Sequence, residues 1–199
     1  MYFFVKLIFS LIFLLSTLFS QSQRGSNIAS GSEGAVPSIS GNGQVIVVKH
    51  GSAFFVYAWN GSAWAQRFNA NLNVSSVDIN YDGSTIIGGS SGADAVLVYQ
   101  WNGSTYTQKG GTLTGQSGDL FGQSVAISND GDVIAIGAPG DDDNGTNRGS
   151  VSVYYWNNSS WALRGPIFTG SQNEEGLGKV VSISGDGTVI STGILTSTY

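Results

Sequence analysis

The feature that most constrains this chain is an eight-residue phrase that occurs four times along it. Every copy holds an Asn-Gly or Asp-Gly pair, with isoleucine four residues before the glycine and three residues after it. The four glycines are Gly43, Gly83, Gly131 and Gly187, at spacings of 40, 48 and 56 residues. Asn-Gly and Asp-Gly between apolar runs are the strongest short-range signal for a β-hairpin, because both residues tolerate a positive φ. The phrase therefore predicts four hairpins of the same kind.

A second phrase, rich in aromatic residues, occurs three times and alternates with the first. It reads Val-Tyr-x-Trp-Asn-x-Ser-x-Trp/Tyr and begins at Val56, Val98 and Val153. In each copy a base follows the last aromatic residue by three positions, and these bases are Arg67, Lys109 and Arg164. The Asn turn inside the phrase predicts a second hairpin. We expect its large rings to pack between neighbouring sheets.

Two hairpins per repeat supply four strands, which is the content of one propeller blade. The predicted fold class is all-β: a partial, open β-propeller of about three and a half four-stranded antiparallel blades, preceded by an N-terminal signal helix. The blade repeats cover residues 36–72, 73–117 and 118–175, and a partial fourth repeat covers residues 176–199. An open propeller leaves an unpaired sheet edge at each end. Pairing with further blades or with another chain is therefore expected there.

The third repeat carries two further short phrases. Phe121-Gly122 precedes its first strand, and Gly137-Ala138-Pro139 ends its second strand. With these phrases, residues 118–155 resemble the FG-GAP repeat of the N-terminal β-propeller of integrin α-subunits and of its microbial and viral relatives. The resemblance implies a propeller that is used outside the cell for adhesion or ligand recognition. Family members that bind calcium carry alternating Asp and Asn ligands between the first two strands of a blade, and here that place holds only the short turn at Gly131.

The N-terminus has the pattern of a secretory signal peptide. Lys6 supplies a positive charge, residues 7–19 are an almost uninterrupted apolar run, and polar sequence follows at once. The apolar run is shorter than the roughly 20 residues that span a bilayer, although an uncut membrane anchor is the alternative. We predict a signal peptide over residues 1–22, a flexible spacer over residues 23–35, and a secreted or cell-surface protein without a membrane span after cleavage.

Composition excludes several classes of function. The net charge is −5, so the basic footprint of a nucleic-acid-binding protein is missing. The chain has no cysteine, which removes thiolate zinc sites and cysteine nucleophiles. Its one histidine, His50, lies in no catalytic pattern, and Glu174 and Glu175 are adjacent rather than opposed across a bond. We predict no enzymatic activity and no cofactor.

Two kinds of modification or ligand site remain as candidates. Asp141, Asp143 and Asn144 could form a weak calcium site, although an exposed acidic turn explains the same residues. Six asparagines stand in Asn-x-Ser/Thr sequons, and these glycosylation candidates are Asn60, Asn73, Asn102, Asn144, Asn157 and Asn158. The Asn turns of the aromatic phrase account for three of these positions.

Export, blade repeats and missing catalytic groups together favour a non-catalytic adhesion or protein-interaction module. Its partner would be an extracellular protein or glycan, contacted through the long loops at residues 138–149 and 165–176. One alternative is a carbohydrate-binding propeller that uses Trp59, Trp101 and Trp156, which requires exposed ring faces. Another is a purely structural segment of a larger extracellular protein, because a fold does not fix a function.

Overall fold

The computed structural model describes residues 24–25 and 36–193. The predicted signal helix at residues 1–22, most of the predicted spacer and residues 194–199 lie outside this part of the chain. The described residues contain strands, bends and turns but no helix, and their sheets are antiparallel. The all-β antiparallel character predicted from the sequence is therefore confirmed. None of the described segments is a helix that could cross a membrane.

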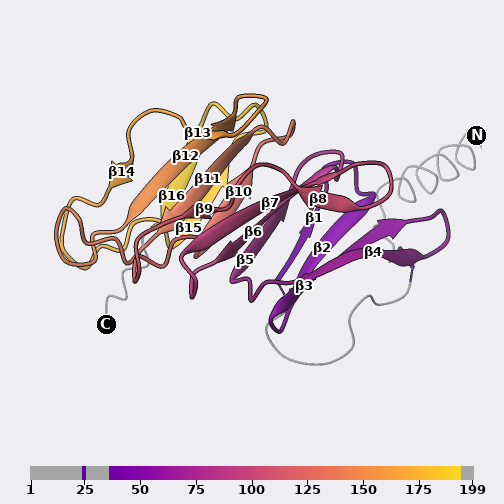
Figure 1. Ribbon diagram of the computed structural model, residues 1–199, viewed down its shortest axis with the longest axis horizontal. Helices are drawn as coiled ribbons and strands as arrows, with labels where there is room; N and C mark the ends of the chain where they lie inside the picture. Colours follow the sequence, from indigo (N-terminus) through magenta and orange to yellow (C-terminus); the bar gives the residue numbers. More distant parts are fainter. Residues whose placement is uncertain (1–23, 26–35, 194–199) are drawn as a thin grey trace, which may run out of the picture.

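The strands form four sheets that follow one another along the chain (Figure 1). The first sheet contains β1 (Val36–Ile39), β2 (Val45–His50), β3 (Ala53–Trp59) and β4 (Trp64–Asn71). The second contains β5 (Ser76–Ile79), β6 (Thr85–Ser90), β7 (Ala95–Trp101), β8 (Tyr106–Gln108) and β9 (Leu113–Thr114). The third contains β10 (Ser124–Ile127), β11 (Val133–Ala138), β12 (Ser150–Trp156), β13 (Trp161–Leu163) and β14 (Phe168–Thr169). The fourth contains β15 (Val180–Ile183) and β16 (Ile190–Gly193).

The first repeated phrase forms the tight turn between the first two strands of every sheet. Its four glycines have φ values of 67° to 77°, in the left-handed region that favours glycine. A polar side chain three residues before the glycine closes the turn, as when the Ser128 hydroxyl accepts a hydrogen bond from the Val133 amide at 2.9 Å. The residues in this closing position are Ser40, Asn80, Ser128 and Ser184. The recurrence of one turn chemistry explains why four hairpins share one geometry.

Neighbouring sheets are joined at these turns by backbone hydrogen bonds. The Asn42 amide donates to the Tyr81 carbonyl at 2.9 Å, the Tyr81 amide to the Asn129 carbonyl at 3.2 Å, and the Asn129 amide to the Gly185 carbonyl at 2.8 Å. The three bonds link all four sheets in sequence. We call this series the turn ladder.

The glycines of the FG and GAP phrases lie at two successive boundaries between sheets. Gly137 on β11 faces the Gly178 carbonyl so closely that a β-carbon has no room there. The same carbonyl accepts a hydrogen bond from the Ser124 hydroxyl at 2.7 Å. One boundary earlier, Gly89 faces the Gly122 carbonyl, which accepts from the Ser76 hydroxyl at 2.9 Å. The glycine of the GAP phrase is thus required because the next sheet's backbone packs against it.

The apolar core lies between the sheets in three clusters. The first two sheets share a cluster that includes Phe54, Ile86 and Tyr106. The second and third sheets share one that includes Ile87, Phe121 and Ile134, and the third and fourth share a smaller one around Val151. The second and third sheets therefore bury both faces against neighbours and the first and fourth sheets bury one, which is how stacked repeats stabilise one another.

Asp78 on β5 connects three sheets through one carboxylate. It accepts hydrogen bonds from the Ser38 hydroxyl at 2.7 Å on the first sheet and from the Ile127 amide at 3.1 Å on the third. Its own neighbour Ile79 donates an amide at 2.9 Å. Burial raises the pKa of Asp78, and the three donors oppose that shift.

Candidate functional site

The two loops predicted to make contacts lie side by side and are bonded to one another. The Glu174 amide donates to the Thr146 carbonyl at 2.8 Å, and the Gly176 amide to the Asn147 carbonyl at 3.0 Å. The Arg148 side chain adds a bond from Nε to the Asn173 amide oxygen at 3.1 Å. Loops 138–149 and 165–176 consequently form one continuous surface, which we call the acidic rim.

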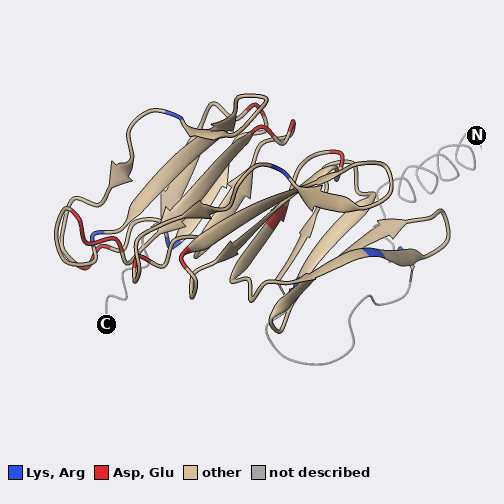
Figure 2. Ribbon diagram, viewed as in Figure 1, with Lys and Arg blue, Asp and Glu red and all other residues tan. Residues whose placement is uncertain are grey.

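The acidic rim concentrates negative charge at one end of the sheets. Its two loops carry five carboxylates and one arginine. Figure 2 shows Asp and Glu positions on the loops beside β14, with Lys or Arg positions close to them, and further Asp and Glu positions elsewhere on the sheets. A surface of one dominant sign steers and selects partners of the opposite sign.

A hollow of about 240 Å³ lies beside the acidic rim, between the second and third sheets. Its apolar wall includes Phe121, Tyr154 and Ile167, and its polar wall includes Asp119, Asp141 and Asp143. Desolvation raises the pKa of Asp119, and the nearby carboxylates of Asp141 and Asp143 raise it further. Three acids beside an apolar wall suit the stem and the charged head of a basic side chain.

The calcium candidates belong to this rim, and two of their carboxylates already accept hydrogen bonds. The Asp141 side chain accepts from the Asp143 amide at 3.1 Å, which shapes the turn. The Asp143 carboxylate accepts from the Gln116 side-chain amide at 2.8 Å. Asn144 is exposed. Within the described residues, no three His, Cys, Asp or Glu side chains converge as a metal-binding group.

All six sequon asparagines are exposed. In the aromatic hairpins the asparagine oxygen closes the turn, as when Asn60 accepts from the Ser62 and Ala63 amides at 3.0 and 2.8 Å. Asn102 and Asn157 do the same in the next two sheets. Turn geometry therefore accounts for these three asparagines, and their exposure keeps them accessible.

The bases that follow the aromatic phrase reach the next sheet. Lys109, from the second sheet, is buried and forms an ion pair with Asp132 at 2.6 Å. Its ammonium also donates to the Gly131 carbonyl at 3.0 Å and lies 5.2 and 5.3 Å from the ring centroids of Trp156 and Trp161. The Trp161 indole N–H donates back to the Lys109 carbonyl at 2.8 Å. We call such a base, set against the two rings of the next sheet, an aromatic clamp.

A second aromatic clamp joins the first sheet to the second. The guanidinium carbon of Arg67 lies 3.4 Å from the Trp101 ring centroid and 5.8 Å from that of Tyr106. The Tyr106 hydroxyl donates to the Gly83 carbonyl, the equivalent of the acceptor that Lys109 uses. Burial raises the pKa of Tyr106 to about 12.

The predicted carbohydrate-contacting rings are involved in these clamps. Trp101 and Trp156 each have a base against the ring, and Trp59 has Arg24 at 4.6 Å from its centroid. Each ring also packs against a second aromatic ring at 5.2 to 5.4 Å between centroids. This packing supports the prediction that the aromatic residues join sheets, and it argues against open platforms for a sugar.

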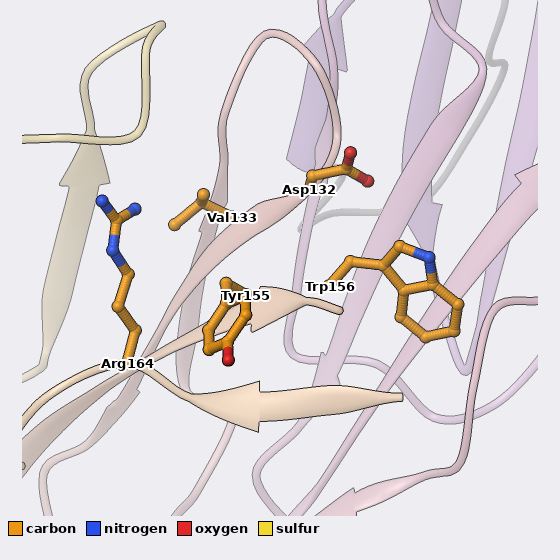
Figure 3. A pocket seen from close by; sticks show the side chains of 5 residues that line it. All are labelled: Asp132, Val133, Tyr155, Trp156 and Arg164. Atoms are coloured by element: carbon orange, nitrogen blue, oxygen red, sulfur yellow. The ribbon is translucent and has the colours of Figure 1, made fainter. Parts of the chain in front are cut away.

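A larger hollow, of about 370 Å³, lies on the third sheet (Figure 3). Figure 3 shows Tyr155 between Arg164 and Trp156, with Asp132 and Val133 at the start of β11. Arg164 donates to the Gly187 carbonyl of the fourth sheet at 3.0 Å. Arg164 on the third sheet therefore reaches the turn of the fourth sheet in the same way as Lys109 reaches the turn of the third.

The acids considered for catalysis have structural partners. Glu174 accepts from the Asn147 side-chain amide at 3.0 Å. Glu175 closes its own turn by accepting from Ser171 and Gln172, and these bonds lower its pKa. His50, at the end of β2, packs near Phe55 with 6.3 Å between ring centroids. None of these contacts forms a pair of opposed carboxylates.

Three structurally important positions were not recognised in the sequence. Gly89 follows its turn glycine by six residues, as Gly137 follows Gly131, so the spacing could have revealed it. Arg24-Gly25 repeats the base-glycine pair of Lys109-Gly110, which was also visible. Asp78 had no such signal, because its two distant partners come from two other repeats.

Comparisons with known proteins agree with this architecture. The family model of the FG-GAP repeat matches residues 114–154. Among solved structures, hydrazine synthase from Kuenenia stuttgartiensis is similar in fold, with a TM-score of 0.60 at 13% sequence identity. The similarity covers 89% of this chain and 46% of that one, so the chain spans less than half of its length. No curated protein sequence matches the chain.

Proposed function

We propose, on the premise of an FG-GAP repeat at residues 114–154 within a propeller-like fold, that this protein is an exported, non-catalytic interaction module. In this proposal the first three sheets are complete blades and β15–β16 is half of a fourth. The blades act as a rigid frame, and the loops at one end bind an extracellular partner, as in adhesion. The observation that carries the proposal is the bonding of the two long loops into one acidic rim.

The charge and shape of the acidic rim favour a basic protein surface as the partner. Asp119, Asp141 and Asp143 line the polar wall of the adjoining hollow, and Tyr154 and Ile167 line its apolar wall. A Lys or Arg side chain of the partner would place its stem on the apolar wall and its charge among the carboxylates. Because the loops are already bonded together, binding would require little ordering of the rim.

A structural role within a larger assembly is the second candidate. Val189, just before β16, is 62% accessible, whereas Val45, Thr85 and Val133 at the same position of the first three repeats are buried against the turn of the next sheet. Such a surface favours pairing with a further blade or another chain.

A matched pair of double variants tests the binding proposal. Asp141→Asn with Asp143→Asn removes two negative charges from the rim, and Ser62→Lys with Ser104→Lys adds two positive charges at aromatic turns. Fluorescently labelled protein would be titrated onto intact cells of the source organism and onto immobilised polylysine. We expect the rim variant to lose about tenfold or more in affinity on both surfaces, while the turn variant loses much less.

Equal binding by the two variants would contradict a role for the rim, because their net charges are the same. Binding of the wild type to polylysine but not to cells would contradict the choice of a cell-surface partner and favour the structural role.

A further inference from the structure

The first sheet carries an aromatic clamp whose base does not come from a preceding sheet. Trp59 and Trp64 stand at the same turn positions as Trp156 and Trp161, with ring centroids 5.4 Å apart in both pairs. The base against Trp59 is Arg24, which precedes the first strand by twelve positions.

Arg24 makes two of the hydrogen bonds that Lys109 makes, while the Asp132 partner of Lys109 is replaced by Gln44. Its guanidinium donates to the Gly43 carbonyl at 2.9 Å, as the Lys109 ammonium donates to the Gly131 carbonyl at 3.0 Å. Its carbonyl accepts from the Trp64 indole N–H at 2.8 Å, which is the length of the bond between Trp161 and Lys109. Four groups therefore occupy equivalent places in the two sites: the cation and the glycine carbonyl that accepts from it, and the indole N–H and the carbonyl of the base that accepts from it.

The residue after the base is also the same. Gly25 has φ +77° and Gly110 has φ +78°. A β-carbon at Gly25 would lie 2.9 Å from the Trp59 ring and 3.2 Å from the Trp64 ring, and one at Gly110 would be equally close to its own pair. Glycine is thus favoured at this position for two reasons, its positive φ and the lack of space beside the rings.

We propose that Trp59, Trp64 and the Gly43 carbonyl form a binding site for an Arg-Gly or Lys-Gly segment, and that Arg24-Gly25 of the same chain fills it. In the third sheet the equivalent ligand is Lys109-Gly110 at the end of the second sheet, whereas the base against the rings of the second sheet is Arg67, which Phe68 follows. Within the described residues no sheet precedes the first one, so Arg24-Gly25 takes the place of a preceding sheet's base and covers the outer face of the first sheet as a cap. The cap keeps two indole rings covered at the edge of the repeat array, where an uncovered aromatic pair would favour association.

The third base-glycine pair shows that the positive φ of the glycine does not depend on an aromatic pair beside it. Gly165 has φ +79°, and Arg164 donates to the Gly187 carbonyl at 3.0 Å. Within the described residues, the space beside a β-carbon at Gly165 is open. The base-glycine segment holds its shape there without an aromatic pair against the glycine.

Indole N–H signals in the nitrogen-correlated proton NMR spectrum of the full chain test the site directly. The chain has five tryptophans, so the Trp64 and Trp161 signals can be assigned by single Trp→Phe substitutions. Gly25→Val should displace the cap, which moves the Trp64 signal towards that of a solvated indole and speeds its hydrogen exchange about five- to tenfold. The Trp161 signal is the internal reference and should not move.

Addition of the peptide Gln-Arg-Gly-Ser to the Gly25→Val chain should then return the Trp64 signal towards its wild-type position. The peptide Gln-Ala-Gly-Ser should have no effect, and the wild-type chain, whose site is filled, should not respond to either peptide. Arg24→Lys should keep the wild-type spectrum, because Lys109 fills the equivalent site, whereas Arg24→Ala should resemble Gly25→Val.

Arg164→Ala is the matched control, because it removes an identical side chain from the third sheet and should leave the Trp64 signal in place. An unchanged Trp64 signal in both Arg24→Ala and Gly25→Val would overturn the proposal. Equal responses to the two peptides would also overturn it, because the site would then bind without recognising the arginine side chain.

Discussion

Substitution of Gly137 by alanine tests the packing of one sheet against the next. A β-carbon at this position would lie 2.6 Å from the Ser124 hydroxyl oxygen and nearer still to the Gly178 carbonyl, whereas ordinary contact begins at about 3.4 Å. The carbonyl belongs to the backbone of the next sheet, so it cannot turn aside as a flexible side chain would. Overpacking of this kind costs about 1–3 kcal/mol.

A second loss adds to the first, because displacement of the Gly178 carbonyl lengthens its 2.7 Å hydrogen bond from Ser124. A typical bond of this kind contributes about 1 kcal/mol, so we expect Gly137→Ala to lower the free energy of unfolding by about 2–4 kcal/mol. Urea unfolding followed by circular dichroism measures the change. Gly92→Ala is the control, because the space around its β-carbon is open and its φ is not positive.

Alanine at an unstrained glycine position changes stability little or raises it by about 0.4–1 kcal/mol. If Gly137→Ala unfolded at the same urea concentration as Gly92→Ala, the sheet boundary could not be as close as described, and the explanation of the GAP glycine would be refuted.

Three further predictions concern titration, a buried hydroxyl and calcium. Carboxyl NMR should place the pKa of Asp78 in the folded protein above 3.8. Protonated Asp78 then stabilises the fold below pH 3.8, and this stabilisation is lost as the pH rises through the higher folded-state pKa. Asp78→Asn should abolish this pH dependence. Tyr106→Phe should cost about 1 kcal/mol in thermal unfolding, because the Gly83 carbonyl loses its donor, while Tyr155→Phe on an exposed ring should cost nothing measurable. Millimolar calcium should leave the midpoint of thermal unfolding unchanged, because the Asp143 carboxylate already accepts a hydrogen bond from Gln116. A rise in this midpoint would support the calcium site instead.

The sequence predicted what depends on short-range chemistry. Turns at Gly43 and its three counterparts follow from the φ that Asn-Gly and Asp-Gly allow, so the hairpins and the antiparallel sheets could be deduced without coordinates. The regular base after each aromatic phrase was also visible in the sequence.

What the sequence did not reveal depends on how sheets meet. The sequence showed a base at Lys109 but not its surroundings: it is buried against two rings and an acid of the next sheet. Asp78 bonds to residues about 40 and 49 positions away, and no local pattern predicts such partners. The acidic rim was predicted as two loops, but their joining needed the bonds around Asn147.

Hydrogen exchange at the turn ladder tests most directly whether successive repeats form sheets that pack on one another. Tyr81 and Asn129 have exposed side chains at the tips of tight turns, where amides normally exchange fast. Their amides nevertheless donate to carbonyls of the next sheet, at 3.2 and 2.8 Å. We predict exchange at these two amides that is slowed to the rate of strand amides, against fast exchange at Gly61 and Gly103 in the aromatic turns. Fast exchange at all four amides would show that the turns of successive sheets are not hydrogen-bonded to one another, and would contradict the packing of successive repeats.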